Sequence, residues 1–255
     1  MRFVSWNVNG IRAVAGKGLL QQLNTLGADV IGLQETKATE EQVAEVLQPF
    51  LADGWHLEAS SAERKGYSGT ALLSRTAPLR VLRELPQAEH NSEGRLLAAE
   101  FPDCWVVVSY VPNSGGELAR LPYRSTWDRD LTSFLSDLDR EKPVFFGGDL
   151  NVAHQPMDLA RPKANYNKTP GYTQIEIDGF TNLLQAGFLD SFRHLHPDRV
   201  EYSWWSYRGG ARENNIGWRL DYWMVSERMA HRLEASRIHP EVSGSDHVPV
   251  SVDWK

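Results

Sequence analysis

A cluster of polar residues follows a short apolar segment near the middle of the chain. Residues 144–148 read Val-Phe-Phe-Gly-Gly, typical of a buried strand that ends at two glycines, and Asp149, Asn151 and His154 come soon after. Asp149 and Asn151 face the same side if the chain stays extended. A carboxylate and an amide oxygen on one side suit a hard cation or a phosphate. A strand followed by an Asx-type turn is the alternative.

Other predicted strands and turns end in polar side chains of the same kinds, which bind cations, hold phosphate or transfer protons. The whole set is Asn7, Asn9, Glu35, Tyr110, Asn113, Asp149, Asn151, Asp221, Asp246 and His247. Carboxylates gathered in one pocket repel one another unless a cation neutralises them, so this oxygen-rich set predicts Mg²⁺, with Mn²⁺ as an alternative. Such a site suits attack of water on a phosphodiester.

Several of these residues leave alternatives open. His247 is either the base or a phosphate ligand, oriented by a carboxylate such as Asp221, unless it is an ordinary buried histidine. Tyr110 on its own also fits an edge strand with its hydroxyl in water. The segment 202–207 is rich in aromatic residues and precedes the basic glycine loop 208–212. That combination suits stacking on a sugar or base beside a phosphate, although the tryptophans could equally be core residues.

Hydrophobic spacing predicts the elements that position these side chains. Strands are expected at 3–8, 29–33, 55–59, 69–73, 79–85, 95–101, 105–110, 144–148, 217–225 and near the C-terminus, and helices at 18–26, 39–51, 121–138 and 175–185. Residues 161–172 are expected to form a long polar loop. A strand, helix, strand order at the start indicates an α/β class, in which chemistry gathers at the strand ends.

Bulk composition narrows the class of protein. The chain has 255 residues with no linker of low complexity, which indicates one domain over 1–255. It has one cysteine, no apolar segment of membrane length and no signal-peptide pattern, so we expect an intracellular, cytoplasmic protein that is neither secreted nor membrane-bound. Nothing in the sequence demands more than a monomer.

The charge distribution is uneven. The net charge of −6 argues against indiscriminate coating of nucleic acid. Basic residues gather in predicted loops, and they are Arg64, Lys65, Arg161, Lys163, Lys168, Arg208, Arg212 and Arg219. If their loops converge, these residues form one basic face around an acidic pocket. If the loops do not converge, the residues are scattered charges in solvent.

Seven motifs, in order and spanning nearly the whole chain, resemble those of the exonuclease III family of apurinic/apyrimidinic endonucleases, within the endonuclease/exonuclease/phosphatase superfamily. They are Ser-Trp-Asn-Val-Asn-Gly at 5–10, Leu-Gln-Glu-Thr-Lys at 33–37, Tyr-Ser-Gly at 67–69, Tyr-Val-Pro-Asn at 110–113, Gly-Gly-Asp-Leu-Asn-Val-Ala-His at 147–154, Trp-Arg-Leu-Asp-Tyr at 218–222 and Gly-Ser-Asp-His at 244–247. The resemblance implies a four-layered α/β sandwich, with two mixed sheets packed face to face and flanked by helices.

The resemblance also implies Mg²⁺-dependent cleavage of double-stranded DNA on the 5′ side of an abasic site, together with action on blocked 3′ ends. By motif position it implies that Glu35, Asn9 and Asp246 bind the metal, together with Asp149, Asn151 and His247. It implies phosphate contacts by Asn7, Asn113, Asn151 and Tyr110, proton transfer by Asp149, and an Asp221–His247 pair. Trp204, Trp218 and Leu220 would wall a pocket for a sugar that lacks a base.

The sequence departs from the vertebrate branch of this family at three positions. Asn9 stands where that branch has an acid, and Gly116 and Arg208 stand where it inserts side chains into the DNA grooves. The balance between endonuclease, 3′-exonuclease and 3′-phosphatase activity is therefore open. Competing hypotheses are a phosphodiesterase acting on another phosphate ester, such as a lipid or inositol headgroup, and a non-catalytic DNA-binding relative.

Overall fold

Two six-stranded β-sheets form the centre of the computed structural model, which describes residues 1–255. The first sheet contains β1 (Arg2–Asn7), β2 (Val30–Gln34), β3 (His56–Ser60), β4 (Thr70–Ser74), β13 (Leu233–Ile238) and β14 (Val250–Trp254). The second contains β5 (Arg80–Leu82), β6 (Leu96–Glu100), β7 (Trp105–Tyr110), β8 (Val144–Asp149), β9 (Phe188–Asp190) and β12 (Asp221–Ser226). Their strand orders are β13-β14-β1-β2-β4-β3 and β5-β6-β7-β8-β12-β9.

Each sheet is mixed, with one parallel pair among antiparallel neighbours. The parallel pairs are β1–β2 and β7–β8, and both lie inside their sheets. Helices lead from the first strand to the second in each pair, so the two strands of a pair end at the same edge of the sheet. This arrangement brings the carboxyl ends of four central strands together.

The sheets pack face to face through a layer of aromatic and aliphatic side chains. Phe3 of β1 meets Phe145 of β8 edge to face, with ring centroids 5.1 Å apart, and Trp254 of β14 packs against both rings. Gly32 of β2 lies so close to Val108 of β7 that a Cβ at position 32 would be 2.5 Å from a methyl carbon. A larger residue there would force the sheets apart, because such interiors are close-packed.

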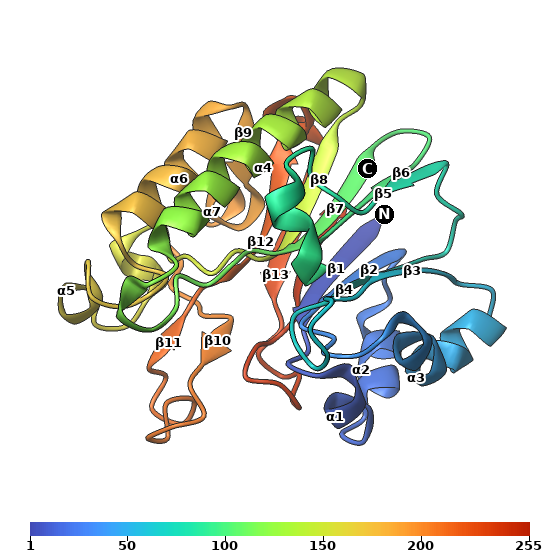
Figure 1. Cartoon of the computed structure of the whole chain (residues 1–255), viewed down its shortest axis with the longest axis horizontal. Helices are drawn as coiled ribbons and strands as arrows, with labels where there is room; N and C mark the ends of the chain where they lie inside the picture. The colour runs from blue at the N-terminus through green and yellow to red at the C-terminus, as the bar shows by residue number, and fades with distance from the viewer.

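Helices cover the two outer faces of the sandwich (Figure 1). The first sheet carries α1 (Ile11–Ala15), α2 (Leu19–Leu26) and α3 (Glu40–Ala52), and the second carries α4 (Leu121–Glu141) and α6 (Gln174–Gln185). Smaller helices are α5 (Pro162–Asn165) and α7 (Ser191–Leu195), and 3-10 turns lie at 88–93, 116–118, 156–158 and 227–232. The four-layered α/β sandwich expected from the sequence is therefore confirmed.

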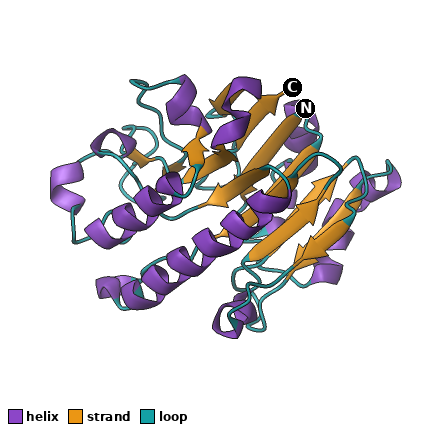
Figure 2. Cartoon of the chain, turned by 90° about the horizontal axis from the view of Figure 1, so that it is seen from above, coloured by secondary structure: helices purple, strands orange, loops and turns teal.

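The chain begins and ends at one place on the sandwich, as Figure 2 shows. The N-terminal ammonium donates to the carbonyl of Trp254, and the Trp254 N–H donates to the carbonyl of Met1. None of the helices is both long enough and apolar enough to cross a membrane.

Several predicted boundaries were wrong. The strand expected at 217–225 is divided into β11 (Gly217–Trp218), which pairs with β10 (Trp204–Trp205), and β12, because Arg219 turns away to bind buried acids. The loop expected at 161–172 contains α5, and the strand expected at 79–85 is reduced to β5. Other strands and α-helices that were not foreseen are α1, β9, α7, β10 and β13, and no 3-10 helix was foreseen.

Candidate active site

Polar side chains converge where the central strands end. Asn7 is the last residue of β1, Tyr110 of β7 and Asp149 of β8, and Glu35 follows β2 directly. In the sheet register Tyr110 lies beside Asp149, and Asp149 lies opposite Asp221, the first residue of β12. Residues from both sheets therefore face one another across one end of the sandwich.

The buried amide of Asn7 links the two acids nearest the centre. Its Nδ2 atom donates to Glu35 Oε1 at 3.0 Å and to Asp149 Oδ2 at 2.9 Å. Its Oδ1 atom accepts from the backbone N–H of Asn9 at 3.0 Å, which fixes the amide's orientation. Asn7 therefore holds the two carboxylates at a fixed spacing without adding charge.

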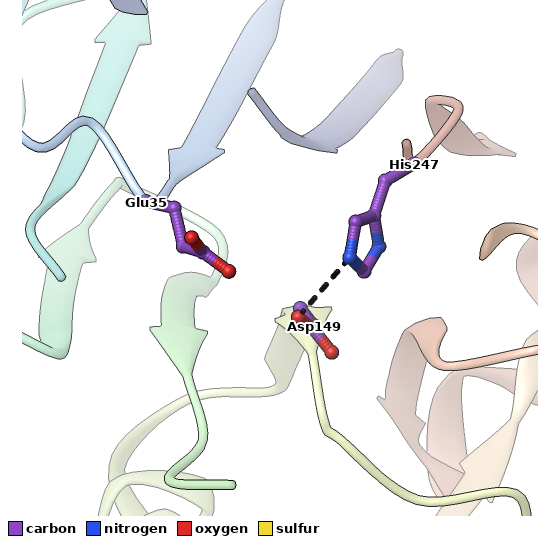
Figure 3. Close-up of side chains that lie close together, drawn as sticks. All are labelled: Glu35, Asp149 and His247. Carbon is purple, nitrogen blue, oxygen red and sulfur yellow. Dashed lines mark ion pairs between the residues drawn. The ribbon is translucent and has the colours of Figure 1, made fainter. Parts of the chain in front are cut away.

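His247 lies between two carboxylates. Its Nδ1 atom is 2.8 Å from Asp221 Oδ2, and its Nε2 atom is 3.7 Å from Asp149 Oδ2. Figure 3 shows the imidazole pointing toward Asp149, with Glu35 across from both. Asp221 also accepts from the hydroxyl of Ser203 at 2.6 Å, and this bond keeps the carboxylate in place behind the ring. The arrangement orients His247 so that its free nitrogen faces the site.

Burial and like charge control the protonation of this group. Burial, reinforced by the nearby Asp221 and Glu35, raises the pKa of Asp149 to about 7, and the facing imidazole only partly offsets this. Burial disfavours a charged His247, yet the negative charges of Asp221 and Asp149 outweigh it and raise the pKa of His247 to about 10. The ring is therefore an imidazolium at neutral pH, while the Asp149 carboxyl can exchange a proton.

Two amides lie beside this acid–imidazole group. Asn113 Nδ2 donates to Asn151 Oδ1 at 3.0 Å, and Asn151 Nδ2 donates to the carbonyl of Val111 at 2.9 Å. The backbone of Asn151 has φ of +49°, and its N–H is held by Asp149 Oδ1 at 2.9 Å. This left-handed turn redirects the chain after β8, so that Asn151 lines the same pocket as Asn113.

A buried arginine supports these amides from behind. Arg124, in α4, donates to the carbonyls of Pro112, Leu150 and Asn151 at 2.8–3.1 Å. Its Nε atom lies 2.8 Å from both carboxylate oxygens of Asp128, one turn further along the helix. The guanidinium thus ties together the backbone that follows β7 and the backbone that follows β8.

The oxygen atoms near Glu35 fit a hard cation. Lys37 Nζ lies 2.6 Å from Glu35 Oε2 and donates to Asn9 Oδ1, so a positive charge already bridges the acid and the amide. Asn9 Nδ2 donates to Asp246 Oδ1 at 2.9 Å. Ligand atoms of Glu35, Asp149 and His247 all lie within 4.8 Å of one another. Carboxylate and amide oxygens match the preference of Mg²⁺.

An open pocket of about 650 Å³ adjoins these groups. Trp204, Trp218 and Leu220 form part of its wall, and the two indoles meet edge to face with ring centroids 6.3 Å apart. The indole N–H of Trp204 donates to Asp246 Oδ2 at 3.0 Å, which connects the aromatic wall to the acidic group. Trp205 and Trp223 belong instead to the core, as the alternative interpretation of the tryptophans expected, whereas stacking of Trp204 and Trp218 on a sugar stays a prediction.

The structure brings the sequence-predicted site residues together. The pocket is lined by Glu35, Tyr110, Asn113, Asp149, Asn151, Trp204, Trp218, Leu220, Asp246 and His247, whereas Asn7, Asn9 and Asp221 support them through hydrogen bonds. Sequence reasoning assigned no role to Lys37, Ser203 or Arg124. Lys37 stands beside Glu35 in its motif, which was a usable signal, but nothing local marks Ser203 or Arg124.

The predicted basic face is only partly present. Arg161 and Arg208 line the pocket, as expected for loops that converge on it. Arg219 does not belong to a basic surface, because its side chain is 1% exposed and ion-paired with Asp158 and Asp190. His154 also points away from the site, since it stacks on Phe180 with ring centroids 4.5 Å apart.

Comparison with known proteins agrees with this geometry. The chain is 48% identical to an exodeoxyribonuclease of Bacillus subtilis, over 99% of this chain and 98% of that protein. It is 44% identical to the DNA repair nuclease APEX1 of Danio rerio, over 99% of this chain and 81% of that protein.

Solved structures show the same architecture. An AP endonuclease from Archaeoglobus fulgidus superposes with a TM-score of 0.90 at 26% identity, covering 100% of this chain and 99% of the other. A 3′ phosphatase from Neisseria bound to a product DNA hairpin gives a TM-score of 0.88 at 30% identity, with coverage of 100% and 99%. The Endonuclease/Exonuclease/phosphatase family model matches residues 4–247, and the chain belongs to that family.

Proposed function

We propose that this protein is a DNA-repair hydrolase that cleaves the phosphodiester backbone on the 5′ side of abasic sites. One observation carries the proposal: a single pocket joins the proton-transfer and phosphate-binding groups to an aromatic wall. The proton-transfer and phosphate-binding groups on their own would suit any phosphate ester. The adjoining wall of Trp204, Trp218 and Leu220 is suited to a small, apolar sugar that lacks a base, which an intact nucleotide exceeds in size.

Each residue of the site has its own role in the reaction. Asp149 takes the proton of the attacking water, since its carboxyl lies at the centre of the site and Asn7 holds its orientation. His247, anchored by Asp221, directs a positively charged N–H at the phosphate and stabilises the negative charge that develops on its oxygens. The amides of Asn113 and Asn151 orient the same phosphate. Tyr110, at the end of β7, supplies a hydroxyl beside Asp149.

Mg²⁺, with Mn²⁺ as a substitute, is the metal that we expect at Glu35. Glu35 would hold it with Asn9 and with oxygen atoms of Asp149 or Asp246, and Lys37 would give up its place between Glu35 and Asn9. The other residues expected as ligands are Asn151 and His247: Asn151 Oδ1 already accepts from Asn113, and the protonated ring of His247 has no lone pair to give a metal. When bound, the metal supplies positive charge that stabilises the phosphate oxygens.

A second activity on 3′ ends has its own support. A Neisseria protein that is 30% identical and similar along its whole length is described as a 3′ phosphatase in one structure and as a 3′-5′ exonuclease in another. A terminal 3′-phosphate presents the same phosphate group to Asp149 and His247 without needing the sugar wall. We therefore propose removal of 3′-phosphates or 3′ nucleotides as the companion activity, carried out by a monomer on DNA inside the cell.

Cleavage of a duplex with one tetrahydrofuran abasic analogue tests the main proposal. Wild type with Mg²⁺ should cut 5′ to the lesion, and EDTA should abolish the cut. Asp149→Asn should lower kcat by about 10²–10⁴, the usual range for loss of a positioned proton acceptor. Asp103→Asn makes the same change at an exposed acid outside the site and should leave the rate unchanged.

The outcomes separate the candidates. No incision, with rapid removal of a 3′-phosphate by the same preparation, would replace the main proposal with 3′-end processing. Magnesium-independent DNA binding with no turnover on either substrate would show a binding protein instead. Full activity of Asp149→Asn on the abasic duplex would contradict the assigned role of Asp149.

A further inference from the structure

The strand segment that supplies half of the pocket wall alternates in direction. Trp218 and Leu220 line the pocket, while Arg219, between them, lies on the opposite side with 1% of its side chain exposed. Alternation is ordinary for an extended segment. A fully buried arginine behind a pocket wall is unusual, because burying a charge without a partner costs much free energy.

Buried acids surround the Arg219 guanidinium. It makes a two-pronged contact with Asp158, at 2.9 Å from Oδ1 and 3.0 Å from Oδ2, and an ion pair of 2.8 Å with Asp190. The same group lies over the ring of Tyr222, 4.4 Å from its centroid. Arg193 completes the set through a 2.6 Å bond to Asp158 Oδ1. We call Arg219, Asp158, Asp190 and Arg193 the ion cluster.

Backbone contacts join the ion cluster to both segments of the wall. The Arg219 N–H donates to the carbonyl of Asp158 at 2.7 Å, and the Ala160 N–H donates to the carbonyl of Gly217 at 2.9 Å. Leu159 and Trp218 form a bridge between these contacts. The segment after Asp158 also carries Ala160 and Arg161, which line the pocket. Asp158 therefore fixes segment 158–161 against segment 217–220.

Contacts outside the ion cluster also reach this wall: the Leu150 N–H donates to the carbonyl of Leu220, the Ser203 N–H donates to the carbonyl of Trp218, and both wall residues pack in a small apolar cluster. The strand β11 has two residues, and its partner β10 also has two, so the sheet register that fixes the strand ends elsewhere is almost absent. Buried ion pairs contribute little net stability compared with apolar packing, because desolvation offsets their attraction. Their best-supported effect is to select one arrangement of the groups that they join.

We propose that the ion cluster positions Trp218 and Leu220 and thereby sets the preference of the pocket for a sugar without a base over an intact nucleotide. This inference rests on the proposed function. The ion cluster touches neither Asp149 nor His247, so the phosphate chemistry common to all substrates does not depend on it directly. Arg219 is a positioning residue in this scheme. Its loss changes the ratio of abasic-site incision to removal of a 3′ nucleotide more than it changes the overall activity.

Arg219→Lys tests the inference, because lysine keeps the charge but lacks the planar fork that contacts Asp158 twice. We would measure kcat/KM for incision of the tetrahydrofuran duplex and for removal of an intact, base-paired 3′ nucleotide. The ratio of the first to the second should fall about tenfold, within the range set by small changes in pocket fit. Arg124→Lys is the matched control, since this buried arginine supports the phosphate amides, and it should lower both values by the same factor.

Asp158→Asn gives an independent measurement if Arg219→Lys does not fold, because it keeps the side-chain size and one acceptor oxygen. Its ratio should shift in the same direction. An unchanged ratio in whichever of the two variants folds, with both activities lowered equally, would overturn the inference and leave the ion cluster as a support for stability only. If wild type fails to incise the abasic duplex, the proposed function fails instead, so the two failures are distinguishable.

Discussion

The two sides of the pocket are built by different means. The side that we assign to the phosphate centres on residues at or just after the ends of β1, β2, β7 and β8, where long ladders of hydrogen bonds fix the backbone, and His247 joins them from the segment before β14. The side that we assign to the sugar consists of the β10–β11 ribbon and the segments around it (Figure 1). Groups on strand ends are held more precisely than groups on loops. We infer that the strand ends fix the positions of the reactive groups, and that the outlying segments determine which substrate fits the pocket.

A buried arginine–aspartate pair supports each side, and the two pairs differ in charge balance. Asp128 has Arg124 as its partner, and burial raises its pKa to about 6. Asp158 is buried as well, yet Arg219, Arg193 and a backbone N–H lower its pKa. One cation does not fully compensate for the desolvation of Asp128, whereas two cations and a hydrogen bond more than compensate for that of Asp158.

The largest expected effect comes from the phosphate side. His247→Gln removes the imidazolium but keeps a polar side chain of similar length. Because both substrates present the same phosphate, kcat for abasic incision and kcat for 3′-phosphate removal should both fall by roughly 10²–10³, the usual cost of one stabilising donor. Steady-state kinetics on the two substrates would check this. Loss of only one activity would contradict a shared phosphate role and would show that His247 takes part in selecting the substrate.

A smaller and selective effect is expected from the sugar side. Trp218→Ala removes the indole that lies between Trp204 and Tyr172. Abasic incision should fall about tenfold to a hundredfold, as expected for lost pocket contacts, while 3′-phosphate removal should stay within about threefold. Trp223→Phe is the control, because that indole packs against Phe3 between the sheets and does not line the pocket. Equal loss of both activities in Trp218→Ala would show that the wall also positions the phosphate.

The same contrast explains how far the sequence alone could predict the site. Asn7, Glu35, Tyr110 and Asp149 were predictable because each follows a buried strand, and parallel strands place their ends together. The sharing of one pocket with Trp204 and Trp218 was implied by the family resemblance, whereas the local pattern indicated only stacking beside a phosphate. Arg219 was misassigned to a basic surface, because its partners Asp158 and Asp190 lie far away in sequence. Charge in a sequence does not distinguish a solvated arginine from a buried one.

Some boundaries failed for related physical reasons. The apolar alternation through 217–225 looks like one strand, but the two-pronged bond to Asp158 interrupts the pairing at Arg219. The edge strands β9 and β13 carry weak local signals, because β9 has three residues and the Cα register of β13 contains a shift. Tertiary contacts that are invisible to a window of local residues decide such elements.

The difference between the two aspartates gives a pH-dependent prediction. Folding raises the pKa of Asp128 from 3.8 to about 6, so between these values the folded state keeps a proton that the unfolded chain releases. This contribution to the free energy of unfolding is fully present below pH 3.8 and is lost as the pH rises through 6. Compared with Asp128→Asn, wild type should lose on the order of 1–3 kcal/mol between pH 4 and 7.

Urea unfolding of both proteins across this pH range would check the prediction, with Asp103→Asn as an exposed control. Asp158→Asn should show the opposite trend, because a lowered pKa stabilises the folded state above pH 3.8 and that stabilisation disappears as the pH falls. A constant difference between wild type and Asp128→Asn would show that folding does not raise the pKa of Asp128.

The smallest expected effect lies where the two sides meet. Trp204→Phe keeps an aromatic ring in the wall but removes the N–H that Asp246 accepts. The free energy of unfolding should fall by about 1 kcal/mol, the usual value for one hydrogen bond, and abasic incision should stay within about threefold of wild type. Thermal unfolding and the tetrahydrofuran assay measure the two quantities. A loss of incision as large as that of Trp218→Ala would instead mean that Trp204 controls the acidic group through Asp246, and the two sides would then act as one unit.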